Sequence, residues 1–178
     1  FCLPGLWRVY QKRGKKAGGQ HRTKSQLAAE VVNPMARWFP ARKILVVGDC
    51  AYVGQHLLKA REANVEVIGP IRWDASLTTP VDPQASRRRK KGDRLPTPAQ
   101  MLADDRRWPG EDMELSFPKG KRRLVVKVVK NVCWYQAAGP QPVQLVLIRD
   151  PAGQWRDEAL VSTDQSLTPQ EVIRGYCR

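Results

Sequence analysis

The sequence has 178 residues, of which 42% are hydrophobic, and its 31 lysines and arginines exceed its 17 aspartates and glutamates, giving a formal net charge of +14. This length is enough for one domain with a core, and no apolar run approaches the roughly 20 residues that a membrane span needs. We therefore expect no membrane partner. An excess of positive charge attracts polyanions, which favours nucleic acid as the partner.

The cysteines and histidines argue against a zinc site. The four cysteines are far apart in the sequence, no CxxC pair occurs, and there are only two histidines (Cys2, Cys50, Cys133, Cys177; His21, His56). Zinc sites have closely spaced Cys and His ligands, so we expect reduced thiols instead. Cys50 and Cys133 are predicted to act as small apolar packing residues.

The first half of the chain has an alternating pattern of helix and strand. After a basic, glycine-containing loop, a helix is predicted from an N-cap at Ser25, with a kink or break at Pro34. The apolar run 43–48 predicts a buried parallel strand, 52–62 a short helix, and 65–68 a second strand. This order indicates an α/β unit.

The second half has a different character. Residues 71–98 are rich in proline and arginine and predict a surface loop or disordered arm, followed by one helical turn at 98–104. Three strands are predicted at 124–132, 143–148 and 159–162, the last two joined by a hairpin turn with the sequence DPAGQW. A capping box at Thr168 and Glu171 begins a final helix. The prediction is a mixed α/β fold with an inserted antiparallel β segment.

Asp49 is the candidate for chemistry, because it follows the first predicted strand. Open α/β sheets bind ligands beyond the carboxyl ends of their strands, and a carboxylate there can hold a metal ion. The alternative is a structural aspartate that caps the following helix, at Ala51 and Tyr52. A dinucleotide site is disfavoured because the surrounding segment lacks the three-glycine fingerprint. From the local sequence alone, the capping role is the better supported of the two.

The segments around Asp49 form an ordered series that begins with the string ILVVGDCAYVG. This string resembles the strand that carries the second acidic residue of insertion-sequence DDE transposases. Further blocks follow in the family's order, from about Leu27 to Arg178: IRWDASL, RRRKKGDRLPTP, LVVKVVKNVCWY, VQLVLIRDPAGQW and ALVSTDQSLTPQEVIRGYCR. They resemble the subgroup with a β-rich insertion between the second Asp and the Glu. One departure is that Val53, not glycine, follows Tyr52.

This resemblance implies a ribonuclease-H-like fold in which an Asp, Asp, Glu triad holds divalent metals, Mg²⁺ or Mn²⁺. It implies that Asp49 is the second carboxylate, that the first lies before Phe1, and that the Glu lies beyond Arg178. Tyr176 matches the Tyr of the motif that carries this Glu, and the chain ends at Arg178, immediately before the signature Arg of the motif. The chain would then be an internal fragment. Because one Asp cannot hold a pair of metal ions, we expect no nuclease or strand-transfer activity from these 178 residues alone.

DNA contacts are predicted in two basic segments and at Tyr176 and Arg178. The main candidate is the basic arm (Arg87, Arg88, Arg89, Lys90, Lys91, Arg94). The alternative is that this segment is only a flexible, solvent-exposed run of charged residues. The loop near the amino terminus is the second (Lys12, Arg13, Lys15, Lys16, Arg22, Lys24). The aromatic side chains of Trp73, Trp134 and Tyr135 could stack on a flipped base. For Trp134 and Tyr135, packing in the core is favoured instead. The acidic segment 104–114 is predicted to be a solvated loop.

The function that follows is metal-dependent DNA cleavage and transfer in transposition. We expect a homo-oligomeric synaptic complex with DNA, located in the bacterial cytoplasm at the nucleoid. The predicted organisation is a partial catalytic core at 1–70, a β-rich insertion with the basic arm at 71–163, and the start of the Glu-bearing helix at 164–178. The alternative is a non-catalytic, basic nucleic-acid-binding protein.

Overall fold

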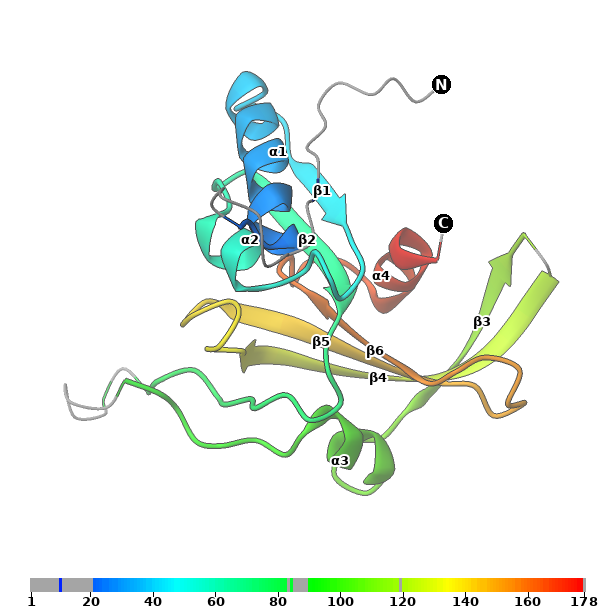
Figure 1. Ribbon diagram of the computed structural model, residues 1–178. Helices are drawn as coiled ribbons and strands as arrows, with labels where there is room; N and C mark the ends of the chain where they lie inside the picture. The colour runs from blue at the N-terminus through cyan, green and yellow to red at the C-terminus, as the bar shows by residue number, and fades with distance from the viewer. Residues whose placement is uncertain (1–9, 11–20, 83, 85–89, 119, 178) are drawn as a thin grey trace.

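The computed structural model describes residue 10, residues 21–82, residue 84 and residues 90–118 and 120–177. Within them, six strands form one sheet in the order β1-β2-β6-β5-β4-β3, flanked by four helices (Figure 1). The elements are α1 (Lys24–Trp38), β1 (Ile44–Val47), α2 (Gln55–Ala60), β2 (Val65–Pro70), α3 (Pro98–Ala103), β3 (Glu111–Phe117), β4 (Gly120–Cys133), β5 (Pro142–Arg149), β6 (Glu158–Ser162) and α4 (Pro169–Tyr176). The mixed α/β class predicted from the sequence is confirmed.

The sheet combines one parallel pair with an antiparallel meander. β1 and β2 run parallel, and β2 pairs with β6 in the antiparallel sense. β6, β5, β4 and β3 are antiparallel neighbours throughout. The strands between 111 and 162 therefore extend the same sheet that β1 and β2 begin.

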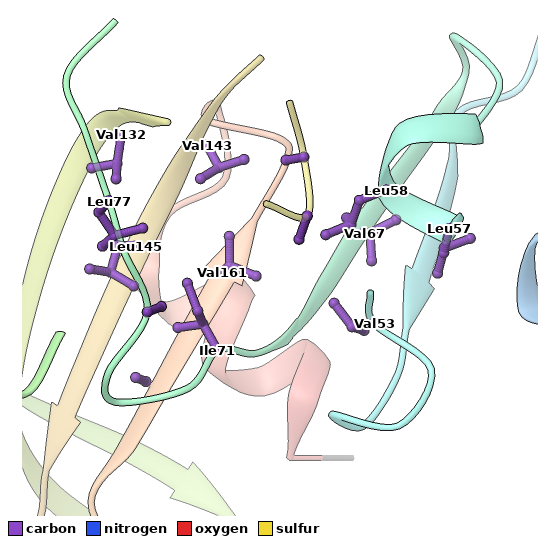
Figure 2. Close-up of a cluster of buried hydrophobic side chains, with 14 of the residues drawn as sticks. Val53, Leu57, Leu58, Val67, Ile71, Leu77, Val132, Val143, Leu145 and Val161 are labelled. Atoms are coloured by element: carbon purple, nitrogen blue, oxygen red, sulfur yellow. The ribbon is translucent and has the colours of Figure 1, made fainter. Parts of the chain in front are cut away.

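Two apolar clusters cover the two faces of the sheet. On one face, α1, α2, α3 and the segment after β2 contribute buried side chains such as Ala36, Leu57 and Met101. Figure 2 shows part of this cluster, from Leu57 and Val53 near β1 to Val132 and Val143 at the far end of the sheet. On the other face, Val172 and Ile173 of α4 pack against Ile68 and its neighbours.

The first helix begins at a different N-cap from the predicted one, and it is not broken at Pro34. Thr23, not Ser25, is the N-cap: its hydroxyl accepts from the Gln26 amide, and the Gln26 side chain accepts from the Thr23 amide. α1 then continues through Pro34 without a break. The residues around the proline are held by tertiary contacts, since Ala36 is buried and Asn33 Nδ2 donates to Ala60 O at 2.8 Å. Such packing outweighs the backbone hydrogen bond that a proline removes.

Two strand predictions need correction. β1 exists, but it is the edge of the described sheet, and Leu45 and Val47 are 45% and 42% exposed. The burial prediction fails because α1 covers only the Ile44 and Val46 face. The predicted acidic loop contains β3, whose alternating Met113, Leu115 and Phe117 face the second apolar cluster, while Asp112 and Glu114 lie on the opposite face. That alternation is a strand pattern.

The remaining elements agree with the sequence. The hairpin turn between β5 and β6 and the capping box of α4 are present as predicted. The segment after β2 is less open than expected, because Ile71, Ala75 and Leu77 are buried. No helix among the described residues has the length and apolar character needed to cross a membrane.

Candidate active site at the carboxyl end of β1

Asp49 lies in a tight turn directly after β1, and its carboxylate is exposed. Its Oδ1 accepts from the Ala51 amide at 2.8 Å, and its carbonyl oxygen accepts from the Tyr52 and Val53 amides at 3.1 and 3.0 Å. Within the described residues, Oδ2 has no hydrogen bond. The hydrogen bond from Ala51 therefore uses one carboxylate oxygen and leaves the other available. The helix-capping alternative is wrong, because the N-cap of α2 is Gly54.

Close backbone packing against β2 holds this turn in place. The Gly48 amide donates to Ile68 O at 3.1 Å, which continues the pairing of β1 and β2 up to Asp49. Gly69 lies so close beneath the turn that a Cβ there would be 2.7 Å from Gly48 O, and nearer still to Val53 Cγ2. Val53 is itself buried in the first apolar cluster. The backbone around Asp49 is therefore held in place by β2 on one side and by the buried Val53 on the other.

The end of α4 lies beside Asp49. Burial raises the pKa of the Tyr176 phenol, and the negative charges of Glu158 and Asp49 raise it further. Glu158 is the first residue of β6, which begins at this end of the sheet because β6 runs antiparallel to β2. Asp49, Glu158 and Tyr176 thus lie in one neighbourhood, although 127 residues separate the first from the last in sequence.

A cavity of about 510 Å³ adjoins Tyr176. Its walls come from the end of β3, the start of β4, the turn before β6 and the end of α4 (Phe117, Arg122, Trp155, Arg156, Glu158, Tyr176). The Arg122 guanidinium lies 4.6 Å from the centroid of the Trp155 ring, and Phe117 meets that ring edge-on at 4.5 Å. Aromatic and cationic side chains therefore line this cavity, and one of its walls is Tyr176, which feels the charge of Asp49.

The described residues do not form a complete metal site. No group of three or more His, Cys, Asp or Glu side chains in the described part of the chain could hold a metal ion. Asp49 has the right chemistry for one ligand, because it is an exposed carboxylate with an available oxygen. It can supply part of a ligand set but not all of it.

The described end of the basic arm, at Arg94, lies at the opposite end of the sheet from Asp49. Thr78 pairs with Cys133 and with Arg94, so the base of the arm joins the carboxyl end of β4. Since β4 and β5 are antiparallel, that end lies away from the β5–β6 turn (Figure 1). Lys90 is exposed here, and Lys91 Nζ lies 5.5 Å from the Tyr135 ring centroid. Arg87, Arg88, Arg89 and Arg178 lie outside the described residues.

The second basic segment is mostly outside the described residues as well, at Lys12, Arg13, Lys15 and Lys16. Of the two that are described, Arg22 forms an ion pair with Glu30. Lys24 Nζ lies 5.4 Å from the Tyr10 ring centroid and 5.5 Å from that of Tyr52. Both cations therefore already have contacts within the protein.

Several smaller predictions can be compared with the structure. Trp73 and Trp134 are half-buried against the first apolar cluster, which agrees with core packing for Trp134. Cys133 is buried as predicted, but Cys50 is exposed, and its packing role is wrong because it follows Asp49 in the surface turn.

The sequence interpretation missed the cavity residues Arg122, Trp155, Arg156 and Glu158, which lie at the same end of the sheet as Asp49. They belong to β4 and to the turn before β6, which the sequence placed in a separate insertion. The available signal was the strand order, because a β6 that pairs with β2 brings its first residues to the end of β1. That pairing is long-range and leaves no local pattern.

Comparison with known proteins gives one match. The family described as DDE superfamily endonuclease matches residues 2–143, which include Asp49 and the strands from β1 to β4. No curated protein and no solved structure matches the chain.

Proposed function

The chain belongs to the DDE superfamily endonucleases, and from this we propose that it acts in the metal-dependent cleavage and transfer of DNA strands during transposition, with Asp49 as a metal ligand. The observation that carries the proposal is the Asp49 turn, whose carboxylate is exposed and keeps one oxygen available at the carboxyl end of the parallel pair β1 and β2. Such a position is where α/β sheets place reactive carboxylates.

Mg²⁺ or Mn²⁺ is the proposed metal, since hard divalent ions prefer carboxylate oxygens. Bound ions of this kind would activate the attacking oxygen and stabilise the leaving oxygen in phosphodiester cleavage. Asp49 would provide one ligand, with the rest of the set coming from outside the described residues. The contribution of this chain's own residues is to hold the Asp49 carboxylate rigidly and to keep Oδ2 unpaired.

DNA is the substrate that the family implies, and the charge of the chain supports it. A net charge of +14 favours binding to phosphate backbones. We further propose a homo-oligomeric complex with transposon ends and a location at the bacterial nucleoid.

The experiment that tests the metal role measures DNA affinity with and without Mn²⁺. Fluorescence anisotropy of a labelled duplex is recorded for the wild type, Asp49→Asn and Asp82→Asn. Asp82 is a matched control, because its Oδ1 accepts from the Gln84 amide two residues on at 2.8 Å, as Asp49 Oδ1 does from Ala51. We expect Mn²⁺ to strengthen DNA binding by the wild type and by Asp82→Asn, and to have no effect on Asp49→Asn.

The alternative function is a non-catalytic nucleic-acid-binding protein. It predicts DNA binding that Mn²⁺ does not change in any of the three chains. That outcome, or a Mn²⁺ effect that survives in Asp49→Asn, would remove Asp49 from the metal site.

A further inference from the structure

Arg156 has an unusual charge environment at the Asp49 end of the sheet. Most other cations in this region already have partners: Lys121 pairs with Glu114, Arg123 with Asp112, and Arg149 with Leu102 O and Asp105. Arg122 donates to Gln154 Oε1 at 2.8 Å. The Arg156 side chain is exposed and, within the described residues, makes no ion pair or hydrogen bond. Its guanidinium is therefore available to an external anion.

Arg156 also stands between two cavities. It lines the cavity of about 510 Å³ that contains Trp155 and Tyr176. Arg156 also lines a second cavity of about 470 Å³, together with Trp73 and Arg149. These cavities flank the β5–β6 turn, with α4 bordering the first and α3 the second. A strand that crossed the turn would pass directly over Arg156.

The turn that carries Arg156 is held firmly. The Asp150 carboxylate accepts from the amides of Ala152, Gln154 and Trp155 at 2.9, 3.0 and 2.7 Å. These hydrogen bonds lower the pKa of Asp150 more than its burial raises it. The Arg122 guanidinium stacks over the ring of Trp155, the residue directly before Arg156. The backbone is fixed before Arg156 by the hydrogen bonds to Asp150 and after it by β6, which begins at Glu158. Little backbone conformational entropy is therefore lost when Arg156 binds a ligand.

We propose that Arg156 contacts a backbone phosphate of DNA beside Asp49, and that a DNA strand crosses the β5–β6 turn between the two cavities. This inference rests on the proposed function, since it takes DNA as the ligand. A guanidinium suits phosphate because its planar donors match two oxygens. Arg94, at the described end of the basic arm, joins the opposite end of the sheet and does not lie beside Arg156.

The test compares Arg156→Gln with Arg123→Gln in the full chain. Both substitutions remove one exposed guanidinium near this end of the sheet, but Arg123 is paired with Asp112. Binding of a labelled duplex is measured by anisotropy at several salt concentrations between about 50 and 200 mM. Circular dichroism melting checks that both variants fold as the wild type does.

We expect Arg156→Gln to weaken binding roughly two- to fivefold and to reduce the slope of log affinity against log salt by about one. Arg123→Gln should keep the wild-type slope. An unchanged slope in Arg156→Gln, with folding intact, overturns the inference and leaves the proposed function standing. If instead the wild type binds no DNA at low salt, the proposed function itself fails. A loss of slope in Arg94→Gln alone would move the DNA to the arm and also overturn the inference.

Discussion

Gly69 in β2 faces the carbonyl oxygen of Gly48 so closely that a Cβ at residue 69 would lie 2.7 Å from that oxygen. Gly48 immediately precedes Asp49, so this contact helps to fix the position of the Asp49 backbone relative to the sheet. Glycine is required here by the close approach of two backbones and not by a positive φ, since none is found at Gly69.

The first prediction follows directly. Gly69→Ala should destabilise the protein by about 1–3 kcal/mol, because neither the Gly48 carbonyl nor the buried Val53 can move away without a backbone shift. The displaced turn should also abolish the Mn²⁺ effect on DNA binding. Urea unfolding and anisotropy measure the two effects. Gly175→Ala is the control, since its Cβ would meet only Ile68 Cδ1 at 3.4 Å. Equal stability of the two variants would contradict this account.

The second prediction concerns a buried ammonium. Lys127 Nζ donates to Met101 O and Leu102 O at 3.1 and 2.8 Å and forms an ion pair with Asp105 at 2.6 Å. The hydrogen bond from Lys127 lowers the pKa of Asp105. Although Asp105 is exposed, Asp105→Asn should lower the urea midpoint, because it leaves the buried charge without its anion.

A double-mutant cycle makes this prediction decisive. In a Lys127→Met background the buried charge is gone, and Asp105→Asn should then change the midpoint little. Equal effects of Asp105→Asn in both backgrounds would show that the ion pair does not couple α3 to β4.

The third prediction is a pH dependence at Asp164. Burial acts to raise the pKa of this carboxyl, but hydrogen bonds from Lys43 and Ser166 outweigh it and lower the pKa below its ordinary value. A carboxyl whose pKa is lower in the folded state contributes stability above its unfolded pKa and loses it as the pH falls through the folded value. Asp164→Asn should therefore cost about 1 kcal/mol at neutral pH and progressively less below about pH 4.

Urea unfolding of the wild type and Asp164→Asn, at neutral pH and near pH 3, measures this difference. Asp82→Asn is the control, because Asp82 is exposed and makes only a local turn contact. A difference between wild type and Asp164→Asn that grows toward acid pH would have the wrong sign for the proposed contacts.

What the sequence predicted well was local. β1, β2 and the strands from β4 to β6 follow runs of apolar residues, and the capping box of α4 follows from Thr168, Pro169 and Glu171. These features are encoded within a few neighbouring residues, which is why composition and period reveal them.

What could not be predicted depends on contacts between distant residues. The helix through Pro34 is stabilised by packing on α2, and the exposure of Leu45 depends on which strands neighbour β1. The cavity beside Tyr176 needs β3, β4 and the β5–β6 turn to meet α4. The end at which the basic arm leaves the sheet depends on the pairing of Thr78 with Cys133. None of these pairings leaves a periodic signal in the sequence.

The last prediction uses Cys50 as a reporter for Asp49. Cys50 is exposed in the turn, whereas burial raises the pKa of the Cys133 and Cys177 thiols. Because the thiolate is the reactive species, iodoacetamide should label Cys50 much faster than the other two. A Cys2→Ser background removes the remaining cysteine, and mass spectrometry of the digested protein gives each rate.

If DNA lies against the Asp49 turn, a saturating duplex should slow the labelling of Cys50 and leave the slow rate of Cys133 unchanged. Arg156→Gln should restore part of the Cys50 rate at a duplex concentration near its weakened affinity, while Arg123→Gln should not. The buried Cys133 reports any general unfolding, since its thiol reacts only when the sheet opens. A Cys50 rate that the duplex does not change, under conditions where anisotropy shows full binding, would place the DNA away from Asp49.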